Sequence, residues 1–176
     1  MRRIALFLGV LGLVAGTPLA NAGERVDVTA MDGVQLIAEL DGASGPGVVL
    51  VPDAGEDASA WQSAASAVAE RGFRVLRLDL RGRGASDGAV DLAAADRDVE
   101  GAARYLLGRK IRPLFLVGKG ATATAVARVA ARVPTAGVVL VGAGGAPEIA
   151  APVLRLESIA DPGALSRLTA WLDSLH

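Results

Sequence analysis

The feature that most constrains the fold is a set of short runs in which nearly every residue is apolar. A strand that is apolar on both faces is typical of a parallel sheet covered by helices on each side. Segments with helical spacing separate these runs, and this alternation favours a mostly parallel sheet. Five runs follow one another in this way: 48–52 (VVLVP), 73–80 (FRVLRLDL), 113–118 (PLFLVG), 137–142 (GVVLVG) and 152–156 (PVLRL).

Before the first of these runs, residues 26–40 (VDVTAMDGVQLIAEL) alternate apolar and polar side chains on both sides of Asp32-Gly33. This pattern predicts an antiparallel β-hairpin with a tight turn. The sequence therefore predicts a three-layer α/β sandwich, whose mostly parallel sheet of about seven strands begins with an antiparallel hairpin. Helices are expected at 58–71, at 91–108, from the end of the 113–118 run through 133, and at 162–175.

The first 22 residues differ in composition from the rest of the chain. MRR supplies positive charge, IALFLGVLGLVAG is apolar, and TPLANA ends in the small-x-small pattern of Ala20 to Ala22. This order is typical of a secretory signal peptide that is cut before Gly23. We therefore expect residues 1–22 to be a signal peptide and the protein to be exported, to the periplasm or the extracellular space. An uncleaved membrane anchor is the alternative, but the apolar stretch is short for a membrane span.

The charge and the residue inventory argue against several classes of function. A formal net charge of -1, without a basic cluster and interleaved aromatics, argues against nucleic-acid binding. The chain has no cysteine, which excludes disulfides, thiol catalysis and cysteine-bound zinc. The aspartates lack the spacing of a metal-binding loop, so we expect neither a metal nor a cofactor. Membrane contact is expected only through the signal peptide during export, and the oligomeric state stays open.

A glycine-rich loop at 81–88 (RGRGASDG) follows the second apolar run. Such a loop can cradle a phosphate, or it can form a tight turn that an arginine anchors. It lacks the G-x-G-x-x-G order at the start of a helix, so we expect the anchored turn.

Several motifs, in the same order along the chain, resemble those of the α/β-hydrolase family. The stretch 79–88 (DLRGRGASDG) is similar to the family's D-x-R-G-x-G-x-S loop and is the most specific match. PDAG at 52–55 stands where the family tends to carry HGxG, and Trp61 stands where it often has Trp or Tyr. VPTAGVVLVGAG at 133–144 resembles the sixth strand and its approach. The resemblance implies that residues 23–176 are a single truncated α/β-hydrolase-like domain of the esterase, lipase or peptidase kind.

In this family the nucleophile elbow, G-x-S-x-G, exposes a serine on a sharp strand-to-helix turn. The segment VGKGATA places Gly118 at the first glycine, Gly120 at the serine and Thr122 at the second glycine. Glycine accepts the backbone conformation of an elbow but supplies no hydroxyl. Gly120 thus stands at the nucleophile position but cannot act as a nucleophile. The alternative nucleophile is Thr122, with Lys119 as its base.

The acid position of the family is retained and the base is not. Residues 152–162 resemble the seventh strand and the G-x-x-D-P loop, which places Asp161 at the acid position. In the family a histidine follows a further strand, but here only Pro162 and Gly163 lie between Asp161 and a helix that resembles the family's last one. We expect the histidine segment and the lid to be absent. The single histidine, His176, lies at the far end of that helix and is not assigned the role of the base.

The resemblance also implies where the donors of an oxyanion hole would lie. They are the N–H group of Ala121 and one from the turn at Asp53 and Ala54. Asp53 brings a negative charge to a place that should accept a developing anion. Together with Gly55 and Lys119, these residues form the expected binding edge.

These observations favour an exported α/β-hydrolase-fold protein that has lost catalysis and binds a small ligand or a partner through this edge. One alternative is a working serine/threonine-type ester or amide hydrolase with a rearranged site. Another is a purely structural or interaction domain without a pocket. The fold alone does not decide between them.

Overall fold

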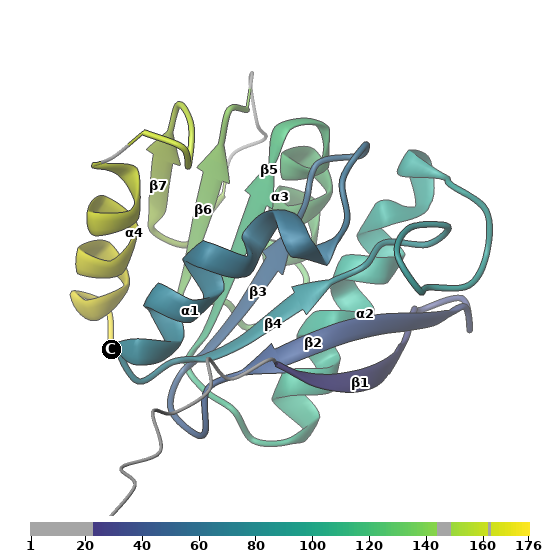
Figure 1. The fold of residues 1–176 in the computed structure, drawn as a ribbon, viewed down its shortest axis with the longest axis horizontal. Helices are drawn as coiled ribbons and strands as arrows, with labels where there is room; N and C mark the ends of the chain where they lie inside the picture. Colours follow the sequence, from purple (N-terminus) through teal and green to yellow (C-terminus); the bar gives the residue numbers. More distant parts are fainter. Residues whose placement is uncertain (1–22, 144–148, 162) are drawn as a thin grey trace, which may run out of the picture.

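The computed structural model describes residues 23–143, 149–161 and 163–176. The expected signal peptide, residues 1–22, lies outside these ranges. The described chain forms a three-layer sandwich in which helices cover both faces of one seven-stranded sheet (Figure 1). The predicted fold class is confirmed.

The sheet is antiparallel at its start and parallel elsewhere. The first two strands form the predicted hairpin, and the second also pairs antiparallel with β4. All further pairs are parallel. In spatial order the strands are β1 (Glu24–Thr29), β2 (Gln35–Asp41), β4 (Arg74–Leu78), β3 (Gly47–Val51), β5 (Leu114–Lys119), β6 (Gly137–Val141) and β7 (Val153–Leu156).

Each face of the sheet is covered by its own pair of helices. On the face that is nearer in Figure 1 lie α1 (Gln62–Glu70) and α4 (Ala164–Asp173), which pack on one apolar cluster. On the other face α2 (Ala95–Gly108) and α3 (Ala123–Ala130) pack on a second cluster. Because successive residues of a strand point to opposite faces, a strand buried between two helical layers must be apolar at every position.

Strand β3 shows this rule directly. Val49 and Val51 contribute to the cluster beneath α2 and α3, whereas Val48 and Leu50 contribute to the cluster beneath α1 and α4. All four side chains are completely buried. Four of the five apolar runs are the central strands, as predicted, and the run at 152–156 is the edge strand β7, of which only Leu156 is buried.

Three helices begin later than the sequence suggested, because a 3-10 turn precedes each of them. These turns are η1 (Ala58–Trp61), η2 (Leu92–Ala94) and η3 (Gly120–Thr122). The carboxylates of Asp57 and Asp91 accept N–H groups of η1 and η2, so both turns are capped at their start. The expectation that the third helix would continue through residue 133 was wrong, since α3 ends at Ala130.

Arg81 connects the glycine-rich loop to two other parts of the fold. Its guanidinium donates to the fully buried carboxylate of Asp98 on α2, with Nη2 2.7 Å from Oδ1. It also donates to both carboxylate oxygens of Asp32 in the hairpin turn, each at 2.9 Å. The expected arginine-anchored turn is confirmed, and the loop after β4 is thereby fixed against α2 and the hairpin.

These contacts change the ionisation of the groups that make them. Hydrogen bonds from Arg81, and then from Arg97, hold the pKa of Asp32 well below its ordinary value of 3.8. Hydrogen bonds to Asp98 and then Asp32 raise the pKa of Arg81 above its ordinary value. Asp32 and Arg81 therefore stay charged over a wider range of pH than free side chains of their types.

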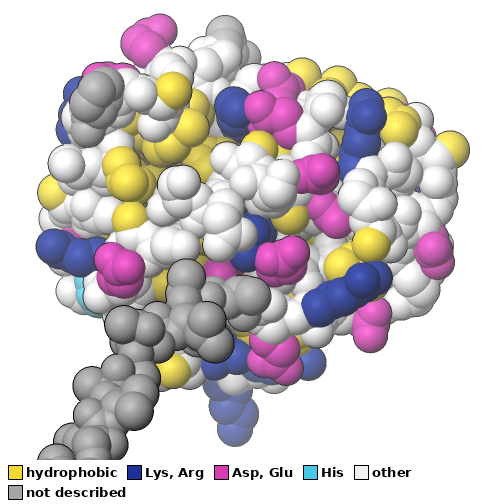
Figure 2. Space-filling view, in the orientation of Figure 1, with side chains coloured by type: hydrophobic (Ala, Val, Ile, Leu, Met, Phe, Trp, Pro, Cys, Tyr) yellow, Lys and Arg dark blue, Asp and Glu magenta, His cyan; other side chains and the backbone are white. Residues whose placement is uncertain are grey.

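The surface carries charges of both signs. Figure 2 shows acidic and basic side chains interspersed over the face of α1 and α4, without a continuous basic region on that face. Within the described ranges, no helix combines the length and the apolar character that crossing a membrane requires.

The Asp32 contacts predict how stability depends on pH. The folded-state pKa of Asp32 lies below its unfolded value, so on acidification the unfolded chain takes up a proton before the folded chain does. Proton uptake favours the unfolded state, and the stability that the ionised Asp32 contributes is lost as the pH falls. Thermal melts should show Asp32→Asn less stable than the wild type by a constant margin above about pH 5, and the margin should shrink below about pH 4. A margin that stays unchanged down to pH 2 would contradict the role given to this carboxylate.

Candidate functional site

The candidate site lies where the parallel strands end, the edge toward which the arrows of β3, β5 and β6 point in Figure 1. In open α/β sheets ligands bind beyond the carboxyl ends of the strands. Strands β3 and β5 are neighbours in parallel register, with Val51 beside Gly118. Two residues further along, this register brings Asp53 beside Gly120.

Strand β5 turns sharply into a helix at Gly120. Its φ of +55° lies in the left-handed region, and the 3-10 turn η3 begins at this residue. Close packing requires glycine at position 118 as well, because a Cβ atom there would lie 2.7 Å from a methyl group of Val126 on α3. The backbone therefore has the shape expected of an elbow, a strained turn with a helix packed closely behind it.

The space above Gly120 is occupied by the side chain of Asp53. A Cβ atom at position 120 would overlap all three terminal atoms of the Asp53 carboxylate. Any side chain at the elbow, a serine included, therefore conflicts with Asp53 in its present orientation. The position that the Asp53 carboxylate takes in this structure therefore requires glycine at position 120.

The same carboxylate accepts both of the expected oxyanion donors. Oδ1 of Asp53 lies 2.7 Å from the backbone nitrogen of Ala54 and 2.9 Å from that of Ala121. Two N–H groups that converge on one oxygen are the geometry of an oxyanion hole. Here the oxygen that accepts both N–H groups is Oδ1 of Asp53, so a protein side chain occupies the place of a substrate oxyanion.

Lys119 is turned toward the loop after β3. Its ammonium group forms an ion pair with Oε1 of Glu56. The other oxygen of Glu56 accepts the backbone N–H of Asp53 at 3.2 Å. Glu56 was not expected from the sequence, and its only signal is its position three residues after Asp53, where a side chain can reach back to a free N–H group.

The hydroxyl of Thr122 is fully buried beneath the elbow. Its Oγ1 lies 2.9 Å from the carbonyl oxygen of Pro52 and 2.8 Å from that of Lys119. Both contacts are to acceptors, so the single proton of the hydroxyl is engaged by the backbone. This geometry does not support Thr122 as a nucleophile or Lys119 as its base.

Asp161 and His176 do not form an acid–base pair. The Asp161 carboxylate accepts hydrogen bonds from Arg167 at 2.7 Å and from the backbone of Gly163, and these bonds hold its pKa below the ordinary value. The His176 ring packs edge-on against Phe73, with its Nδ1 2.9 Å from the carbonyl oxygen of Leu172. Phe73 directly precedes β4, so His176 lies at the amino ends of the strands, opposite the elbow.

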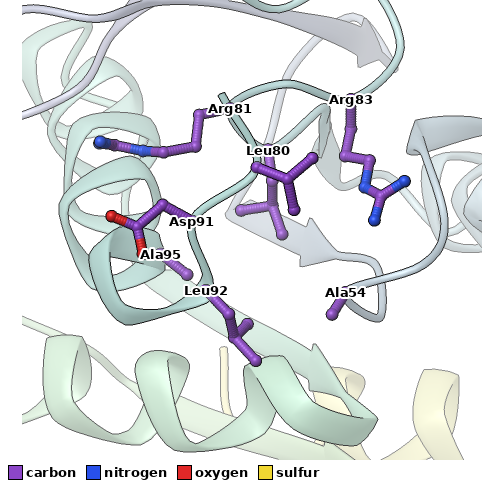
Figure 3. A pocket seen from close by; sticks show the side chains of 8 residues that line it. Ala54, Leu80, Arg81, Arg83, Asp91, Leu92 and Ala95 are labelled. Carbon is purple, nitrogen blue, oxygen red and sulfur yellow. The ribbon is translucent and has the colours of Figure 1, made fainter. Parts of the chain in front are cut away.

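Two hollows lie beside the elbow. One is open, has a volume of about 380 Å³, and is bounded by the loops after β3 and β4, including Gly55 and Glu56. The other is narrow and apolar and lies between Ala54, Leu80 and Leu92 (Figure 3). Arg83 lines both. Across residues 23–143, 149–161 and 163–176, no three acidic or histidine side chains are grouped closely enough to hold a metal ion.

A family model described as "Serine aminopeptidase, S33" matches residues 45–172. A search of curated proteins finds no match. The solved structure of the Pyrococcus furiosus esterase Pf2001 is 20% identical with a TM-score of 0.64, covering 76% of this chain and 56% of its own. The epoxide hydrolase VrEH1 from Vigna radiata is 20% identical with a TM-score of 0.62, covering 72% and 42%. The α/β-hydrolase GrgF from Penicillium sp. sh18 is 24% identical with a TM-score of 0.59, covering 67% and 45%.

At these identities the solved structures show a shared fold. The chain spans 42% to 56% of the length of these three proteins. The activities on epoxides and esters that their names state are therefore properties of those proteins and are not assigned to this chain.

The conflict between Asp53 and a side chain at position 120 predicts non-additive stabilities. We expect Gly120→Ala to lower the free energy of unfolding by about 2–4 kcal/mol, because strain at positive φ is added to the overlap. Gly72→Ala is the matched control, since its φ is +87° but nothing lies near the new Cβ atom. It should cost only about 1–2 kcal/mol.

Urea denaturation of a double-mutant cycle measures the overlap itself. In an Asp53→Ala background, the cost of Gly120→Ala should fall to that of Gly72→Ala. Equal costs of Gly120→Ala with and without the Asp53 carboxylate would show that the two positions do not exclude each other.

Proposed function

The chain belongs to the serine aminopeptidase S33 family of α/β-hydrolases, and we propose that it is an exported member without catalytic activity. In this proposal the elbow keeps the shape of an active site, and the edge around it binds a small ligand or a partner.

One observation carries the loss of catalysis: the Asp53 carboxylate fills the oxyanion hole. Acyl transfer develops a negative charge on the carbonyl oxygen of the substrate, and two convergent N–H groups stabilise it. At Ala54 and Ala121 these groups already bond to a negative oxygen. A second negative oxygen there would have to displace the first and would be repelled by it.

The remaining parts of a serine-type mechanism are missing as well. Gly120 supplies no hydroxyl, and the hydroxyl of Thr122 is buried and bonded to carbonyl groups. A base must lie within hydrogen-bond reach of the proton that it removes. His176, the single histidine of the sequence, packs at the opposite end of the sheet. No specific observation favours the alternative of a rearranged ester or amide hydrolase.

Binding at the edge is supported by the hollows beside the elbow. The open hollow of about 380 Å³ lies at the end of the sheet where ligands of this architecture bind. Export is supported by the N-terminal sequence, in which a basic start, an apolar stretch and a small-x-small end occur in the order of a signal peptide.

Activity assays test the loss of catalysis. The purified protein should hydrolyse p-nitrophenyl acetate no faster than buffer, and a fluorophosphonate probe should not label it, because neither reagent meets an activated hydroxyl. An active serine hydrolase assayed in parallel serves as the positive control. Labelling that disappears in Thr122→Ala would contradict the proposal and establish the rearranged hydrolase in its place.

Export is tested by the N-terminus of the mature protein. After expression of the full chain in a bacterial host with a periplasm, mass spectrometry should find the periplasmic species beginning at Gly23. Ala22→Arg, which removes the small residue before the cut, should abolish processing. Intact wild-type protein in the membrane fraction would instead support the uncleaved anchor.

A further inference from the structure

Arg83 differs from the other basic side chains near the carboxyl ends of the strands. Lys119 is paired with Glu56, and Arg81 is paired with Asp98 and Asp32. Among the described residues, the guanidinium of Arg83 makes no ion pair, and its enclosed Nε has no hydrogen-bond partner. The carboxylate of Asp53 already occupies the N–H groups of Ala54 and Ala121 at the elbow. An anion that binds at this edge therefore needs another group to pair with.

The loop that carries Arg83 is held in a fixed position. The Asp79 carboxylate accepts the backbone N–H of Ala58 at 2.7 Å and that of Ala85 at 3.1 Å, which joins the loop to the start of η1. The Ser86 hydroxyl donates to the carbonyl of Asp79 and accepts the N–H of Ile37. A side chain on so constrained a backbone is positioned before a ligand arrives, which lowers the entropic cost of binding.

Arg83 stands between an apolar hollow and an open polar one. Figure 3 shows the Arg83 side chain beside Leu80, with its guanidinium above Ala54 in this view. On one side of it lie the apolar side chains of Leu80, Val90 and Leu92. On the other side lies the open cleft of about 380 Å³. One positive group beside an apolar hollow suits an anion that carries a hydrocarbon chain.

Two exposed side chains mark the rim of the apolar hollow. Val90 is 54% exposed and Leu92 is 44% exposed, and of the described large hydrophobic residues only Met31 is comparably exposed. Burial of exposed apolar surface is favourable in water, so a hydrocarbon chain that covers these two residues is stabilised. Their position at the same hollow as Arg83 makes the site amphipathic.

The acidic side chains around Arg83 each have partners of their own. Glu56 is paired with Lys119, and the carboxylate of Asp57 accepts the backbone and hydroxyl groups of Ser59. The carboxylate of Asp91 accepts the N–H of Ala93 at 3.0 Å. None of these carboxylates lies within 4.0 Å of the Arg83 guanidinium, which is therefore available to a ligand.

From these observations we infer that Arg83 anchors a medium-chain fatty acid. The guanidinium donates to the carboxylate in the bidentate geometry that arginine favours, and the hydrocarbon chain lies over the exposed Val90 and Leu92 at the rim of the hollow. A single guanidinium matches one carboxylate, whereas a phosphate dianion calls for more donors. The inference rests on the proposed function, in which this edge binds rather than hydrolyses.

Titration calorimetry with sodium octanoate, below its micelle concentration, tests the site in the purified protein. Arg83→Met should weaken octanoate binding at least tenfold. The hydrocarbon chain of octanoate keeps its apolar contacts in this variant, but its carboxylate loses the guanidinium. Arg83→Lys should bind with intermediate affinity, since charge is kept and the bidentate geometry is lost. Leu92→Ser should weaken octanoate more than butyrate. Arg128→Met, at an exposed arginine on α3, is the matched control and should bind like the wild type.

Thermal melts of each variant establish that it is folded. Octanoate that binds folded Arg83→Met as tightly as wild type overturns the assignment, and so does folded wild type that does not bind octanoate. Either result, together with absent fluorophosphonate labelling, leaves the loss of catalysis standing. Hydrolysis of p-nitrophenyl octanoate with labelling of the protein would overturn the proposed function, whatever the calorimetry shows.

Discussion

The parallel register of β3 and β5 determines what can lie at the elbow. With Val51 beside Gly118, the residue after Pro52 emerges next to the turn that leads into α3. Both strands are buried between helical layers, and alternate side chains pack into two different apolar clusters, so close packing on both faces holds the pairing in this register. The chemistry of the edge thus follows from a constraint of the core.

Within that constraint, Asp53 gives the elbow a stable resting arrangement. Backbone N–H groups at the start of a helix need acceptors, and an empty oxyanion hole relies on water to supply them. A carboxylate accepts more strongly than water and interacts favourably with the helix start. In this structure both donors are satisfied by the Asp53 carboxylate, which is the basis of the proposed loss of catalysis.

The sequence predicted the periodic parts of the molecule and the places of two backbone donors. The hairpin and the buried strands follow from local patterns, whereas the donors at Ala54 and Ala121 were expected only from the resemblance to the family's elbow and its neighbouring turn. The orientation of Asp53 over Gly120 was not predictable, since it depends on a register between segments nearly seventy residues apart. Glu56 and Arg83 were missed for a related reason. Their roles come from neighbours on other loops, and their sequence context is that of ordinary surface residues.

The mutual exclusion of Asp53 and a side chain at position 120 also has an evolutionary consequence. A codon change from glycine to serine at the elbow meets the carboxylate, and a change of Asp53 alone leaves two backbone donors without their acceptor. Each single change is therefore expected to lower the stability of the fold. A lineage that carries both residues would regain a side chain at the elbow without that loss only if both positions changed together.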